Sequence, residues 1–137
     1  MLTRKLAIFA LPFVLLACPV TGQVAIADSE PAQVWSILEI AGTTATGDAH
    51  LAMDPDGNAF GSSGCNRFKT TVTQSGSVLS FGLIAATRMA CPGALAAQES
   101  TLFDLFAQQL AVTYDVLRDQ VTLTASSGAI LILQRSE

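Results

Sequence analysis

Two short blocks of the sequence combine residue types that could do chemistry. Cys65 lies two residues before Arg67, and Cys91 lies three residues after Arg88. Two cysteines can form a structural disulfide or a redox pair, and a neighbouring positive charge favours the reactive thiolate. Neither cysteine lies in the C-x-x-C arrangement typical of redox enzymes, although Cys91 lies just before an expected helix. A disulfide is favoured, and a redox pair or two buried free thiols remain open.

Glu99 is the third candidate, because it falls on the apolar stripe of the same expected helix, four residues after Leu95 and three before Leu102. A carboxylate on that stripe points towards the sheet, and a buried carboxylate has to be paired or protonated. The available cations are Arg67 and Arg88, so we expect a structural ion pair, with Arg88 as the first partner. An acid–base site is the weaker alternative, because arginine keeps its proton at ordinary pH.

Asn66 completes an expected polar cluster of Asn66, Arg67, Arg88 and Glu99. Its amide can satisfy leftover backbone groups in a tight turn. His50 is the only histidine, and no second ligand lies at metal-binding spacing. The run from Asp54 to Asn58 superficially suggests a calcium loop, but it lacks the closing glutamate and predicts a hairpin turn. We therefore expect no cofactor, no metal and no catalytic residue.

The start of the chain predicts export. Residues 1–17 combine a basic head with an apolar run too short to span a bilayer, as in a signal peptide. Leu15-Leu16-Ala17-Cys18 resembles a lipobox, in which the cysteine is acylated and becomes the N-terminus. We therefore expect contact with the periplasmic face of a bacterial membrane through Cys18. Cleavage after Ala27 remains open and would give a soluble periplasmic or secreted protein.

The charge of the chain argues against a nucleic-acid partner. Removing the signal leaves five basic residues against eleven acidic ones, a net charge of about −6. An acidic domain without a stripe of lysine and arginine cannot bind phosphate backbone by releasing counterions. The expected partner is instead an unknown envelope protein or a ligand.

Hydrophobic periodicity predicts one domain over residues 33–137, after a tether at residues 18–32. Strands are predicted at 34–40, 50–53, 59–62, 68–74, 78–81, 111–117, 121–125 and 129–133. Apolar residues spaced by three, four and seven predict one amphipathic helix over residues 93–110. The expected fold class is α+β, a single small domain of antiparallel strands curled around one amphipathic helix.

These features, in this order, resemble the META domain, the family of the heat-shock protein HslJ. The residues that carry the resemblance are Trp35, Asp56-Gly57, Gly64-Cys65-Asn66-Arg67-Phe68, Thr87-Arg88-Met89-Ala90-Cys91, Glu99, Phe103, Leu110 and Tyr114. The resemblance covers residues 33–134 and implies a small α+β domain, usually exported and often lipid-anchored. It implies no catalytic activity that could be carried over residue by residue.

Two classes of function follow. The first is a non-enzymatic exported envelope protein, lipid-anchored or soluble, that binds a partner or ligand in envelope integrity or stress tolerance. The second is a small hydrolase or redox factor that uses the neighbourhood of Cys65, Arg67, Arg88 and Glu99. Thiol titration of the denatured, unreduced protein separates them in part, because a disulfide leaves no thiol to act as nucleophile.

Overall fold

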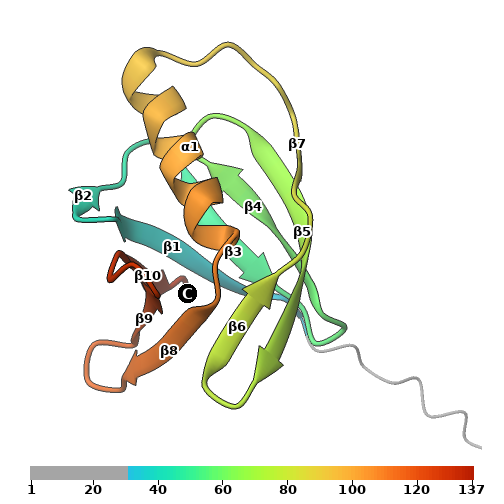
Figure 1. Ribbon diagram of the computed structural model, residues 1–137, viewed down its shortest axis with the longest axis vertical. Helices are drawn as coiled ribbons and strands as arrows, with labels where there is room; N and C mark the ends of the chain where they lie inside the picture. The colour runs from blue at the N-terminus through green and yellow to red at the C-terminus, as the bar shows by residue number, and fades with distance from the viewer. Residues whose placement is uncertain (1–30) are drawn as a thin grey trace, which may run out of the picture.

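Antiparallel strands make up most of the structure, a computed structural model that describes residues 31–137 (Figure 1). The predicted signal peptide, both cleavage sites and Cys18 lie outside the described residues. The strands are β1 (Gln33–Ile40), β2 (Thr43–Thr44), β3 (Ala49–Met53), β4 (Asn58–Ser63), β5 (Arg67–Ser75), β6 (Val78–Phe81), β7 (Ala85–Ala86), β8 (Leu110–Asp115), β9 (Gln120–Ala125) and β10 (Ile130–Arg135). The helix is α1 (Gly93–Phe106).

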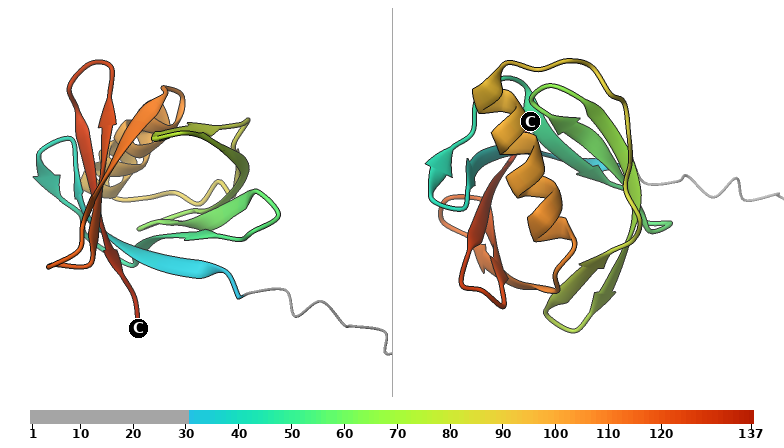
Figure 2. Two further views of the ribbon diagram at one scale, coloured as in Figure 1. Left: turned by 90° about the horizontal axis from the view of Figure 1, so that it is seen from below. Right: turned by 45° about the horizontal axis from the view of Figure 1, so that its top comes forward.

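Eight of these strands form a closed barrel. Neighbouring strands pair in the order β1, β3, β4, β5, β6, β8, β9 and β10, and β10 pairs again with β1. This last pairing places Trp35 opposite Arg135 and Ile40 opposite Leu131. Figure 2 shows the strands curving around a common interior, which α1 crosses at one end. The short strands β2 and β7 pair with β1 and β5.

The expectation of an α+β fold with strands curled around a helix is therefore wrong. The domain is mostly β, and its strands curl around one another until the first pairs with the last. The helix is shorter than predicted: it ends at Phe106, because Leu110 already begins β8 and pairs with Ala125. The alternating apolar residues of the strands face the interior of a barrel, where they fill much of its volume themselves.

The helix closes one end of the barrel. Its buried residues are Leu102, Leu105 and Phe106. The ring of Phe106 packs against those of Phe68 and Phe81, with centroids 5.6 and 4.3 Å apart. These two residues lie at the start of β5 and the end of β6, so α1 covers the end of the barrel where those strand termini meet. We call this the closed end.

The opposite end carries the β3–β4, β5–β6 and β8–β9 turns, and we call it the open end. In the first turn, the Asp54 carboxylate accepts the Asn58 backbone N–H at 2.9 Å and its side-chain amide at 2.8 Å. These bonds lower the pKa of Asp54, so their stabilisation is present above the unfolded-state pKa and lost as the pH falls through the folded-state pKa. The prediction of a hairpin turn here is confirmed.

Candidate functional site

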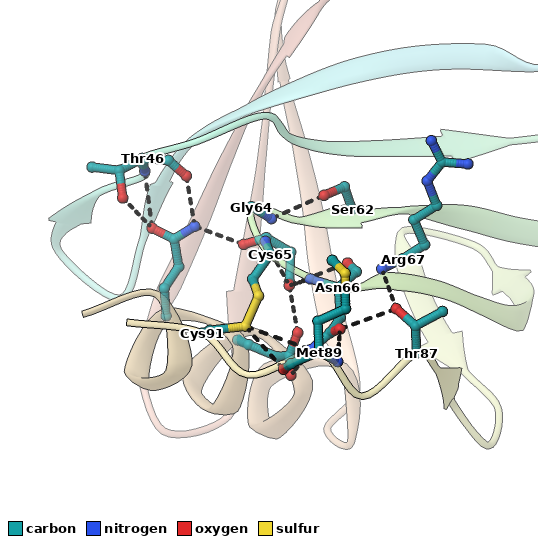
Figure 3. Close-up of a disulfide and its surroundings, with 12 residues drawn as sticks. Thr46, Ser62, Gly64, Cys65, Asn66, Arg67, Thr87, Met89 and Cys91 are labelled. Carbon is teal, nitrogen blue, oxygen red and sulfur yellow. Dashed lines mark hydrogen bonds between the residues drawn. A yellow bond between two sulfur atoms is a disulfide. The ribbon is translucent and has the colours of Figure 1, made fainter. Parts of the chain in front are cut away.

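The first candidate site is the polar cluster at the closed end, where the β4–β5 turn meets the start of α1 (Figure 3). Asn66 lies at its centre and is only 2% exposed. Its Nδ2 donates to Glu99 Oε1 at 3.0 Å. Its Oδ1 accepts from the Met89 backbone N–H at 2.7 Å and from the Thr87 hydroxyl at 3.0 Å. One side chain therefore joins the turn, the segment before the helix and the helix itself.

Ser63 holds the other oxygen of Glu99. Its buried hydroxyl lies 2.6 Å from Glu99 Oε2 and accepts the Asn66 backbone N–H at 3.1 Å. Because the hydroxyl has one proton, it donates to the carboxylate and accepts from the turn. Both carboxylate oxygens are thus satisfied by neutral donors.

The predicted ion pair between Glu99 and an arginine is therefore wrong. The ion pairs found within residues 31–137 join other residues, and both Arg67 and Arg88 are exposed. Strand alternation explains the position of Arg67, since the inward position on β5 belongs to the next residue, Phe68. Figure 3 shows the Arg67 side chain extending away from the disulfide. Glu99 is half-buried at the boundary between the helix and the turn, where neutral hydrogen bonds suffice.

Cys65 and Cys91 form a disulfide within the same cluster, as favoured from the sequence. Their Cα atoms are 6.1 Å apart, and the bridge joins the β4–β5 turn to the residue two before α1. A bridge closing a loop of this length contributes about 3.5 kcal/mol on the chain-entropy model. The cluster thus brings together Asn66, Glu99 and the two cysteines; Arg67 joins it only through its backbone N–H, which donates to the Thr87 hydroxyl at 3.1 Å, and no side-chain contact of either arginine belongs to it.

Gln98 also belongs to this cluster, and sequence reasoning missed it. Its Nε2 donates to the Ser63 carbonyl at 2.7 Å and to the Thr46 carbonyl at 2.9 Å. Its Oε1 accepts the Thr46 backbone N–H at 2.9 Å. A polar residue next to Glu99 near the start of the helix was the available signal. The cluster ties three separate segments together, an arrangement suited to holding the closed end in place.

The second candidate site is a cavity of about 860 Å³ at the open end of the barrel. Side chains from β5, β6, β8, β9 and β10 form its apolar wall: Val72, Leu79, Val112, Val121, Leu123 and Leu133. Polar side chains, among them Asp54, Gln74 and Arg135, lie at its mouth. A concave apolar site with a few polar groups at its edge is typical of small-molecule binding sites.

A chain of polar contacts organises the mouth of this cavity. The Tyr114 hydroxyl donates a hydrogen bond to Asp119, which raises the pKa of Tyr114. Asp119 also pairs with Arg135, with Nε and Oδ2 3.5 Å apart. The Arg135 guanidinium lies 5.2 Å from the centre of the Trp35 ring, within the range of a cation–π contact. These contacts fix the position of Trp35, which lines the cavity.

Trp35 contributes a buried polar group without a partner. The side chain is 5% exposed, and its Nε1–H makes no hydrogen bond among the described residues. Leaving a buried donor unsatisfied costs about 1 to 3 kcal/mol. Sequence reasoning used Trp35 only as a mark of resemblance. The missed signal was a tryptophan in a strand, whose N–H usually finds a partner when it is buried.

Two further properties describe residues 31–137 as a whole. They contain no group of three His, Cys, Asp or Glu side chains placed to hold a metal ion. Their one helix is also not long and apolar enough to cross a membrane.

Fold and sites together define a small antiparallel β-barrel, closed at one end by a helix and a disulfide and open at the other. The chain belongs to the META domain family, whose sequence model matches residues 28–137. A comparison with curated proteins finds no match. The family predicted from the sequence is thereby confirmed.

Two solved structures are similar to this chain, and both were determined by NMR. One has 22% sequence identity and a TM-score of 0.63, and the match covers 74% of this chain and 87% of that one. The other, a protein from Burkholderia xenovorans, has 26% identity and a TM-score of 0.56, with 79% and 83% covered. The first of these likenesses supports the fold alone.

A substitution test follows from the geometry of the cluster. Asn66→Ala removes the partner of Met89 and of Glu99, and each buried group left unsatisfied costs about 1 to 3 kcal/mol. We expect the free energy of unfolding to fall by about 3 kcal/mol. Arg88→Met is the matched control and should change it by less than about 0.5 kcal/mol, as is usual for a surface position. Urea denaturation with the disulfide intact measures both; equal losses would mean that Arg88 shares the role of Asn66.

Proposed function

We propose that this protein is a non-enzymatic, exported binding protein of the bacterial cell envelope, which holds an apolar ligand in the open end of its barrel. The observation that carries the proposal is the apolar cavity of about 860 Å³ with the Trp35 side chain in its lining. Its volume lies within the roughly 300 to 1,000 Å³ of ordinary ligand pockets.

The dimensions of the barrel support a single small ligand. A barrel of eight strands is just wide enough to be filled by side chains or to hold one small molecule. In this barrel, Leu102, Leu105 and Phe106 of α1 fill the closed end. The ligand therefore enters between the turns of the open end and lies against the apolar wall.

Arg135 limits the chemistry of the ligand. Its guanidinium lies over the Trp35 ring and offers N–H donors near the mouth of the cavity, where an oxygen acceptor on the ligand can pair with them. The ligand class that fits is an apolar chain or ring system that carries an oxygen acceptor at one end.

The closed-end cluster supports a structural role over a catalytic one. The disulfide engages both sulfur atoms, and both oxygens of Glu99 accept hydrogen bonds. The alternative, a small hydrolase or redox factor, needed Arg67 and Arg88 beside these groups. Both arginine side chains are exposed and neither pairs with Glu99, so the structure offers this alternative less support.

Export and the envelope location rest on the sequence. The signal-like residues 1–17 and the lipobox ending at Cys18 support delivery to the periplasmic face of a membrane. Cleavage after Ala27 would instead give a soluble protein with the same barrel. Similarity to the family of a heat-shock protein supports a contribution to envelope integrity or stress tolerance.

Fluorescence of the single tryptophan tests the cavity directly, because Trp35 lines it. We expect a brominated long-chain fatty acid, added below its micellar concentration, to quench Trp35 emission saturably, with one site per chain. Val112→Arg places a charge in the apolar wall and should weaken binding at least tenfold. The matched control is Leu83→Arg, at an exposed residue outside the cavity, and it should bind as the wild type does.

Two outcomes of the fatty-acid titration would contradict the proposal. Circular dichroism and the melting temperature establish that Val112→Arg is folded before its binding is compared. Linear, unsaturable quenching, or equal quenching in both variants, would mean that the fatty acid adsorbs to the surface and that the cavity is not the site.

Mass spectrometry of the mature N-terminus, after expression in a bacterial host with the full signal, tests the proposed anchor. We expect a diacylated or triacylated peptide that begins at Cys18. Cys18→Ser should release the protein from the membrane fraction or leave the signal uncleaved. A peptide that begins at Asp28 would contradict lipidation while leaving export and the barrel unaffected.

A further inference from the structure

An exposed apolar pair lies at the tip of the β8–β9 hairpin. Val116 is 76% exposed and Leu117 is 98% exposed. The turn that carries them is ordered by Asp115, whose Oδ1 accepts the backbone N–H groups of Leu117 at 3.0 Å and of Arg118 at 3.3 Å. Exposing two adjacent apolar side chains to water is unfavourable, yet the turn is built so that both remain outside the barrel.

This hairpin tip stands beside the mouth of the cavity. The strand that follows it contributes Val121 to the cavity wall, and Asp119 in the same turn pairs with Arg135 at the mouth. In Figure 1 the β8–β9 and β5–β6 hairpins extend from the same end of the barrel, opposite the start of α1. The exposed pair and the cavity therefore face the same surroundings.

The chain also enters the barrel at this end. Pro31 and Ala32, the first described residues, line the mouth of the cavity. They follow the predicted lipidation position, Cys18, by only 13 and 14 residues. A segment of that length spans at most about 45 Å when fully extended, so an anchored domain stays near the membrane with this end tethered to it.

From these observations we propose that the open end of the barrel docks on a lipid bilayer, with Val116 and Leu117 inserted among the acyl chains. The proposal goes beyond ligand binding, since it concerns the orientation of the domain and does not require an occupied cavity. It places the mouth of the cavity at the lipid surface, where apolar molecules are concentrated. Insertion of a hairpin tip does not require the chain to span the bilayer. It adds a second membrane contact to that of an acyl anchor.

Charge at the open end determines which lipid surface is suited to it. The turns at this end and the C-terminus carry the carboxylates of Asp54, Asp56, Asp115, Asp119 and Glu137, against the guanidinium groups of Arg118 and Arg135. Carboxylates outnumber cations, so an anionic surface would repel this end. We therefore expect docking to zwitterionic lipid to be tighter than docking to anionic lipid at low salt.

The test uses the mature chain from residue 18 onwards with Cys18→Ser, so that no acyl group contributes. We expect it to float with vesicles of phosphatidylcholine, and replacing both Val116 and Leu117 by aspartate should lower the partition coefficient at least tenfold. The matched control replaces Leu83 and Met89 by aspartate, a pair 98% and 61% exposed in the segments between β6 and α1. The control should float as the parent chain does.

Three outcomes would overturn the proposal. The first is that the parent chain does not float with phosphatidylcholine vesicles. The second is that both double variants lose binding equally, which indicates general adsorption of exposed apolar residues. The third is a dimer of the parent chain in light scattering that only Val116→Asp with Leu117→Asp dissociates, because a second copy would then cover the tip. Trp35 quenching by the brominated fatty acid, measured on the same variant, reports on the cavity separately.

Discussion

Pairing between β1 and β10 is the constraint on which the rest of the structure depends. It joins residues nearly the whole length of the domain apart, Trp35 with Arg135 and Ile40 with Leu131, and converts an open sheet into a barrel with an interior. It also sets Arg135 close to Trp35, so that the guanidinium lies over the ring at the mouth of the cavity. The closed barrel has two ends: the helix covers one of them, and an apolar cavity lies at the other.

The two ends of the barrel differ in how their buried polar groups are satisfied. At the closed end, Asn66, Ser63, Glu99 and the disulfide hold α1 against the β4–β5 turn, and every polar group named there has a partner. Such a fully satisfied network rigidifies its surroundings. At the open end the Trp35 N–H lacks a partner. The satisfied cluster suits the closed end to a supporting role, and the proposed binding site is the cavity at the open end.

Local patterns predicted the elements well and the architecture poorly. The alternation of apolar residues located β6 at Val78–Phe81 and came within a few residues of the other long strands, because this signal depends only on near neighbours. Closure depends on a pairing between the first and last strands, which no local pattern encodes. The ion pair between Glu99 and an arginine was predicted wrongly for a related reason. Proximity to a cysteine in the sequence does not determine which face of a strand Arg67 occupies. The disulfide was predictable because the domain has only two cysteines.

The indole N–H of Trp35 offers the most direct test of the claim that the open end binds an apolar ligand. The protein has one tryptophan, so its Nε1–H gives a single resonance in a ¹H–¹⁵N correlation spectrum. Added dodecanoate, below its micellar concentration, should shift this resonance as the ligand packs beside the Trp35 side chain, together with the amides of Val121 and Leu133. The side-chain amide of Asn66 should stay in place. An unmoved indole resonance, or shifts confined to the closed end, would contradict the account.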